Sequence, residues 1–227
     1  MNKKERISLY AILIIAIVLI IVLPLKCAKE KEQPRPALEQ ALTLYERGKY
    51  KQALPYFAQA EKEGFPEASF ALGAMYFAGR GVPADPAKAI SYYEKAADLN
   101  YAPAQTTLAM LYMQGKIVGR DEQKALMLAK KAAENNDMEA QIMLAGWFET
   151  GEHIPQDIKQ AVHYYQLAAH NGDINAKMAL SIIFKKGKED LPANIYTAKR
   201  WQDSIQKQKR FENIFQNLPP DYIEKVR

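Results

Sequence analysis

The sequence has a single cysteine, Cys27, among its 227 residues. One cysteine excludes an internal disulfide framework and any zinc cluster that needs several cysteine ligands. Glycine (11) and proline (12) are not enriched, which excludes collagen-like and low-complexity chains. Because apolar residues make up 48% of the chain, we expect most of it to fold.

Motifs for catalysis and phosphate binding are also missing. No G-x-S-x-G, H-E-x-x-H or P-loop pattern occurs. Gly79–Ala84 fits the loose dinucleotide pattern G-x-G-x-x-A, but the apolar residues before it have helical spacing, whereas that motif requires a strand. His163 and His170 could share one face of a helix, yet no carboxylate stands near them at ligand spacing, so surface residues are the better interpretation. The sequence predicts no catalytic residue, cofactor, metal or small-molecule substrate.

Excess charge of one sign is limited, because the net charge is only +5. Residues 66–173 carry nine Lys/Arg against 13 Asp/Glu, whereas residues 174–227 carry 11 against six. A basic end beside an acidic middle can bias the docking of a partner, although solvated surface is the commoner reason for such a tail. No basic patch is interleaved with aromatic residues in a recognisable motif, so we predict no nucleic-acid partner.

One long uncharged run is present, from Ile7 to Leu25, directly after three basic residues. As a helix this run spans about 28 Å, close to the thickness of the hydrocarbon layer of a membrane. The alternative is a cleaved signal peptide, but Leu23–Cys27 contains neither a small-x-small site nor the small residue before cysteine of a lipoprotein site. We therefore predict an uncleaved signal anchor over residues 1–25, with membrane contact through residues 7–25.

The orientation of this anchor follows from the flanking charges. Lys/Arg residues on its two sides nearly balance, but a very short basic N-terminus usually stays inside the cell. The soluble part is therefore predicted to lie outside the cytoplasm. Residues 26–36 are charged and contain proline, which is typical of a spacer.

Beyond this spacer the chain repeats itself with a period of 36 residues, over 66–101, 102–137, 138–173 and 174–209. Each copy has a leucine, then a small residue, and an aromatic residue four positions after the leucine. The three sets are Leu72, Leu108, Leu144 and Leu180; Gly73, Ala109, Ala145 and Ser181; and Tyr76, Tyr112, Phe148 and Phe184. Residues four apart share one face of a helix, so each copy begins with a helix that has one apolar face.

The second half of each copy predicts a loop and another helix. A glycine follows the first helix, as expected for the left-handed residue that ends it, and an Asp or Asn then caps the next helix. Pro86 stands at the first position of one such helix, where proline is tolerated. A double alanine closes the first three copies, which would let neighbouring pairs approach closely; the fourth copy drifts by one residue and loses it.

This pattern resembles the Sel-one-like repeat family, relatives of the tetratricopeptide repeat. The resemblance covers residues 66–209, and the shorter turn within residues 37–65 resembles a tetratricopeptide helix pair. Residues 210–227 would form a C-terminal cap and tail. The resemblance implies an all-α, right-handed superhelical solenoid of about five helix pairs, here with one N-terminal transmembrane helix.

In such solenoids the first helices line the concave side, and the register then gives the lining positions. The apolar ones are predicted to bind protein: Phe70, Phe77, Met110, Met113, Ile142, Met178 and Ile182. The same register places Ala74, Thr106, Gly146, Glu149 and Lys185 on this side. The alternative is that tight curvature buries these residues against one another.

The resemblance implies a scaffold or adaptor whose partner is a protein. With the predicted anchor and without a catalytic motif, we predict a membrane-anchored scaffold that is not an enzyme. It also implies a place in a bacterial envelope, with the anchor in the inner membrane and the repeats in the periplasm. The alternative function is a periplasmic immunity protein that binds and inhibits a toxic effector enzyme.

Overall fold

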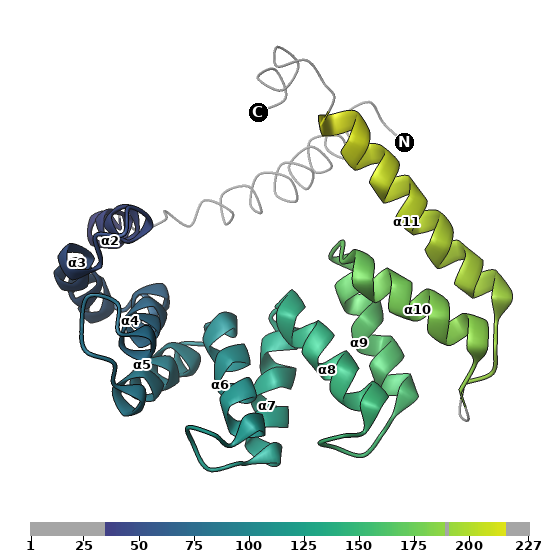
Figure 1. Cartoon of the computed structure of the whole chain (residues 1–227), viewed down its shortest axis with the longest axis horizontal. Helices are drawn as coiled ribbons and strands as arrows, with labels where there is room; N and C mark the ends of the chain where they lie inside the picture. The colour runs from purple at the N-terminus through teal and green to yellow at the C-terminus, as the bar shows by residue number, and fades with distance from the viewer. Residues whose placement is uncertain (1–34, 189–190, 217–227) are drawn as a thin grey trace, which may run out of the picture.

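A computed structural model describes residues 35–188 and 191–216. The described part of the chain forms helices throughout, joined by short loops (Figure 1). These helices are α2 (Pro36–Glu46), α3 (Tyr50–Lys62), α4 (Pro66–Ala78), α5 (Pro86–Asp98), α6 (Ala102–Gln114), α7 (Glu122–Glu134), α8 (Met138–Thr150), α9 (Ile158–His170), α10 (Ile174–Lys186) and α11 (Ile195–Gln216).

The helices pack as consecutive pairs, and the pairs follow one another along an arc from α2 to α11 (Figure 1). The predicted all-α solenoid is therefore confirmed. The predicted anchor at residues 7–25 lies outside the described residues. Among the helices of 35–188 and 191–216, none combines the length and the apolar character needed to cross a bilayer.

The registered leucines form the centre of each pair. Leu72, Leu108, Leu144 and Leu180 are all buried, as are the double alanines. The small residue beside each leucine sets the distance between the two helices. At Gly73 an added Cβ would lie 2.6 Å from Cδ1 of Tyr93 on α5, so only glycine leaves room for that ring.

The loops within the repeats are joints between two helices, and the segment before Gly79 is the helix α4. Gly79, Gly115 and Gly151 end α4, α6 and α8 in the left-handed conformation, as predicted. At Gly115 an added Cβ would also lie 2.6 Å from the Cβ of Arg120, where the loop folds back. Gly187 has a positive φ but an extended ψ of 171°, so the fourth loop leaves its helix differently.

The predicted N-caps are present. Asp85, Asp121 and Asp157 each accept a hydrogen bond from the backbone amide three residues later, at 2.8–3.0 Å. Such caps stabilise a helix by about 1 kcal/mol each. The structure adds Asp137 and Asp173, which cap the first helices α8 and α10 in the same way.

A ladder of buried amides joins successive pairs. The side chains of Gln105 and Gln141 are fully buried, and each donates from Nε2 to the carbonyl of an alanine that closes the preceding helix. Asn171 then donates from Nδ2 to Oε1 of Gln141 at 3.0 Å. These bonds satisfy polar groups that would otherwise be costly to bury.

The two ends of the array depart from the repeat. α2 and α3 are joined by a tight turn in which Gly48 has a positive φ of 70°. At the other end, α11 is 22 residues long, against 13 for α10, and continues through residue 209 without a break. In α11 the double alanine of the earlier copies is replaced by Ile205, which is buried, and Gln206, which is exposed.

Candidate functional site

The candidate surface consists of the registered residues on the first helices, which we call the first-helix face. It contains positions 70, 74 and 77 of α4, 106, 110 and 113 of α6, 142, 146 and 149 of α8, and 178, 182 and 185 of α10. Of the seven residues predicted to bind protein, the structure exposes three and half-buries three more: Phe77, Met178 and Ile182 are exposed, and Phe70, Met110 and Ile142 are half-buried.

Met113 is the exception, because its side chain is only 2% exposed. It belongs to the apolar cluster that extends from α5 to α9. A methionine has enough rotatable bonds to fill a gap in such a cluster. The prediction that Met113 lines an accessible surface is therefore wrong, and the alternative of burial applies to it.

The N-terminal part of the first-helix face is largely committed to packing. The ring of Phe70 lies 5.4 Å from that of Tyr93 and 5.5 Å from that of Tyr101, measured between centroids. Thr106 is buried and donates to Asp137 at 2.9 Å. Phe77 remains 41% exposed at the end of α4, so it is the accessible apolar residue of this part.

The C-terminal part of the face is more open. Met178 and Ile182 are 46% and 51% exposed and lie one turn apart on α10. Ile142 of α8 packs against a cluster that combines α9 residues with Leu180 and Ile183 of α10. We call Ile142, Gly146, Met178 and Ile182 the α8–α10 patch.

Gly146 gives this patch its shape. An added Cβ at Gly146 would meet no atom within 4 Å, and its backbone is ordinary helix. The equivalent positions carry Ala74, Met110 and Ile182 in the other repeats, so the third repeat alone lacks a side chain there. The register position of Gly146 is therefore open space, which a side chain from another molecule could occupy.

A hydrogen bond fixes the edge of the patch. Tyr165 of α9 donates its hydroxyl to Oε2 of Glu149 at 2.8 Å. Burial raises the pKa of Tyr165, and the Glu149 carboxylate raises it further. Glu149 is therefore held against the second helix as an acceptor and does not extend over the apolar residues.

The histidines do not come together as a site. His170 lies with Nδ1 2.6 Å from the carbonyl oxygen of Gln166, and His163 contacts the ring of Tyr164 edge-on. Within residues 35–188 and 191–216, no three His, Cys, Asp or Glu side chains are grouped as metal ligands would be.

Sequence reasoning missed the amide ladder. Gln105 and Gln141 stand one full period apart, directly after the registered Ala104 and Ala140, and Lys177 continues the series. The recurrence of glutamine at the same position of two repeats was the available signal, because a solvent-exposed position does not require the same amide in each repeat.

A family model of the Sel1 repeat matches residues 66–101, 102–137 and 139–173. Residues 66–173 contain three Sel1 repeats. The matched segments coincide with three of the four repeats predicted above, the third within one residue. Sel1 repeat proteins are generally scaffolds for protein interactions and not enzymes.

Solved structures show the same architecture. A Sel1 repeat protein from Oxalobacter formigenes is 25% identical with a TM-score of 0.66, over 81% of this chain and 77% of that one. The protective antigen c5321 of uropathogenic Escherichia coli is 26% identical with a TM-score of 0.61, over 70% of this chain and 34% of that one, so this chain spans about a third of its length.

The immunity protein Pa5087 from Pseudomonas aeruginosa is 20% identical with a TM-score of 0.41, over 74% of this chain and 82% of that one. A similarity at that level does not transfer a function. Comparison with curated protein sequences gives no match.

Proposed function

We propose that this protein is a membrane-anchored scaffold that binds a partner protein through the first-helix face, with the α8–α10 patch as the principal contact. The observation that supports the proposal is the exposure of Met178 and Ile182 on α10, together with the open space at Gly146 on the preceding first helix. Exposed apolar side chains that gather on one face are typical of protein-binding surfaces.

The chemistry of the patch favours an apolar anchor on the partner. Methionine and isoleucine offer dispersion contacts without hydrogen-bonding groups, and methionine adapts its shape to what it contacts. An aliphatic or aromatic side chain placed over Gly146 would contact residues of both first helices at once. Phe77 provides a second contact about two repeats away, which suits an extended or helical segment better than a small ligand.

Site-specific photocrosslinking in cells tests this proposal. A photoreactive amino acid replaces Ile182 in one strain and Met127 in the other. Met127 is 61% exposed on α7 and lies outside the first-helix face, so it is a matched control. We expect a discrete adduct of higher mass from position 182 and none from position 127.

A second variant makes the test specific. Gly146→Leu fills the vacant position without meeting any atom near Cβ, so the fold should persist while the adduct from position 182 disappears. Equal adducts with and without the Gly146→Leu substitution would place the binding face elsewhere. Mass spectrometry of the adduct also separates the two functions, because an immunity protein would be joined to a toxic enzyme whose activity it blocks.

We further propose that residues 7–25 anchor the protein in a bacterial inner membrane with the repeats in the periplasm. The proposal rests on the uncharged run after a basic N-terminus. The protein should stay in the membrane fraction after alkaline carbonate extraction, and its N-terminus should lie at or near Met1. A mature N-terminus near Cys27 would contradict the anchor. An alkaline phosphatase fused after residue 216 should be active, and an inactive fusion would contradict the orientation.

A further inference from the structure

In the first three repeats, the last registered residue of the first-helix face is tied to the body of the solenoid. The ring of Phe77 lies 6.5 Å from that of Tyr93 on α5, measured between centroids. Met113 is buried, and Glu149 accepts the hydroxyl of Tyr165 on α9 at 2.8 Å. Tyr93 and Tyr165 stand at the same register position, so their two contacts are equivalent.

Lys185 occupies this position in the last repeat and has no such contact. Because of the one-residue drift, its counterpart on α11 is Gln202, which is exposed and has no aromatic ring. Lys185 is exposed as well, and among the described residues no carboxylate lies within ion-pairing distance of its ammonium. Its charge therefore remains available to another molecule.

Lys185 also continues the exposed apolar stripe of α10. Met178, Ile182 and Lys185 follow one another at intervals of four and three residues, which places all three on one side of the helix. At a rise of 1.5 Å per residue, Lys185 stands about 4.5 Å beyond Ile182 along the helix axis. A segment that lies along α10 would thus contact two apolar side chains and then a cation.

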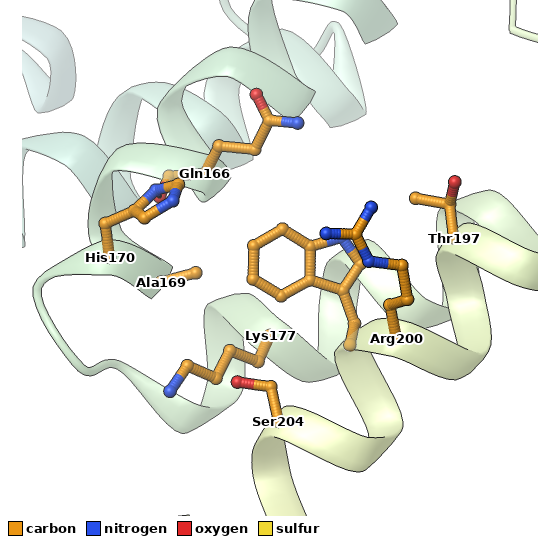
Figure 2. A pocket seen from close by; sticks show the side chains of 8 residues that line it. Gln166, Ala169, His170, Lys177, Thr197, Arg200 and Ser204 are labelled. Atoms are coloured by element: carbon orange, nitrogen blue, oxygen red, sulfur yellow. Dashed lines mark hydrogen bonds between the residues drawn. The ribbon is translucent and has the colours of Figure 1, made fainter.

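The other lysine that α10 shares with a neighbouring helix, Lys177, is already engaged. It is 8% exposed, and its ammonium donates to Oε1 of Gln208. Lys177 lines a pocket of about 530 Å³ where α9, α10 and α11 meet, and Figure 2 shows it pointing away from Arg200. The cations of this pocket therefore do not converge, in contrast to the open side of α10 that carries Lys185.

The charge around Lys185 has the same sign. Residues 174–216 carry nine Lys/Arg against four Asp/Glu, and Lys186 and Lys188 are both exposed. The acid at the equivalent position of α8, Glu149, is held by the hydroxyl of α9 described above. A surface with excess charge of one sign attracts segments of the opposite sign and disfavours those of its own sign.

We propose that the partner segment bound at the α8–α10 patch is acidic and helical. Its apolar anchor would contact Met178 and Ile182, and an Asp or Glu three or four residues from the anchor would pair with Lys185. This inference rests on the scaffold proposal, because it names the chemistry of the partner for the same patch. Exposed ion pairs contribute little to affinity but help to discriminate between partners, so Lys185 selects the segment that the apolar residues hold.

Selection from a random 12-residue peptide library, with the full chain in a neutral detergent as the target, tests the proposal. Peptides retained by wild type and lost with Ile182→Ser, a change at an exposed position, are those that bind the patch. Among them, Asp or Glu should be enriched over the unselected library three or four residues from a large apolar residue. Lys185→Glu should select Lys or Arg at that spacing instead. Lys199→Glu, an equal change at an exposed position of α11 outside the first-helix face, should select the same acidic peptides as wild type.

A synthetic peptide with the most enriched sequence then measures the ion pair directly by fluorescence anisotropy. Replacing its acid by the matching amide should weaken binding to wild type about two- to fivefold, as for an exposed ion pair, and should leave binding to Lys185→Gln unchanged. Patch-dependent peptides without acidic enrichment, or the same enrichment with Lys185→Glu, would overturn this inference and leave the scaffold proposal intact. If no selected peptide depends on Ile182, both proposals fail.

Discussion

Two glycines inside first helices should respond in opposite ways to the same substitution. Gly73 in α4 and Gly146 in α8 are both helical, so alanine improves intrinsic helix stability at each by about 0.5–1 kcal/mol. Their surroundings differ. At Gly146 the new Cβ meets nothing within 4 Å, so Gly146→Ala should stabilise the protein by about that amount.

Gly73→Ala should be destabilising. The new Cβ would lie 2.6 Å from Cδ1 and 2.7 Å from Cε1 of Tyr93, about 1 Å inside a normal carbon contact. The ring cannot move aside freely, because Tyr93 is buried and lies 5.4 Å from the ring of Phe70. Overpacking of this kind costs about 1–3 kcal/mol, which exceeds the gain in helix propensity.

Urea denaturation followed by far-ultraviolet circular dichroism measures both effects on the full chain in detergent. We expect the midpoint to rise for Gly146→Ala and to fall for Gly73→Ala relative to wild type. A separation of about 2 kcal/mol would correspond to several degrees in the thermal midpoint of a chain of this size. If both variants shift in the same direction, the close approach of α4 and α5 around Tyr93 does not control stability.

Three further changes test the packing and its pH dependence. Met113 is buried, so Met113→Ala should lower the free energy of unfolding, measured in urea, by about 2–5 kcal/mol. Met178 is on the surface, so Met178→Ala should change this free energy by no more than about 0.5 kcal/mol. Similar losses for the two variants would contradict the distinction between the core and the α8–α10 patch. Ala133→Leu should overpack the junction between pairs and cost about 1–3 kcal/mol, and an unchanged thermal midpoint would show that the double alanine does not set the spacing. Burial raises the pKa of Tyr93 to about 12, so the folded state binds the phenolic proton more tightly than the unfolded state does. The resulting contribution to stability is complete below about pH 10, the ordinary pKa of tyrosine, and is lost as the pH rises towards 12. Tyr93→Phe should therefore move the alkaline unfolding midpoint to higher pH, and a midpoint that does not move would exclude Tyr93 as a cause of alkaline unfolding.

The repeat made the helices predictable from sequence. Leucine, small residue and aromatic recur with the glycine and the capping Asp, so one period defines two helices and the loop between them. Helix ends and N-caps depend on residues that are close in sequence, and the same residue types recur at these positions from one copy to the next. The left-handed glycines and the N-caps at Asp85, Asp121 and Asp157 were predicted correctly for that reason.

Accessibility was less predictable, because it depends on how neighbouring helices cover a face. Register alone treats Phe77 and Met113 as equivalent, yet one is exposed and the other is in the core. The pocket at the last junction is a similar case. Its residues come from three helices. Because of the one-residue drift, each α11 residue stands 37 and not 36 positions after its equivalent in α9, so the 36-residue period does not reveal which residues correspond.

The amide ladder has a consequence for how the array can change in length. Gln105 bonds the end of α5 and Gln141 bonds the equivalent end of α7, so these two internal junctions present the same acceptor to the same donor. Removal of residues 102–137 would bring Gln141 to the Ala97 carbonyl, where Gln105 was, with no amide left over. Whole units of 36 residues can thus be gained or lost by recombination while every buried glutamine keeps its carbonyl acceptor. A deletion of 35 residues would shift Gln141 out of this register and leave its buried amide without that acceptor. Lys177 donates to Gln208 of α11 and not to an alanine carbonyl, so the last junction cannot be exchanged with the two internal ones in this way.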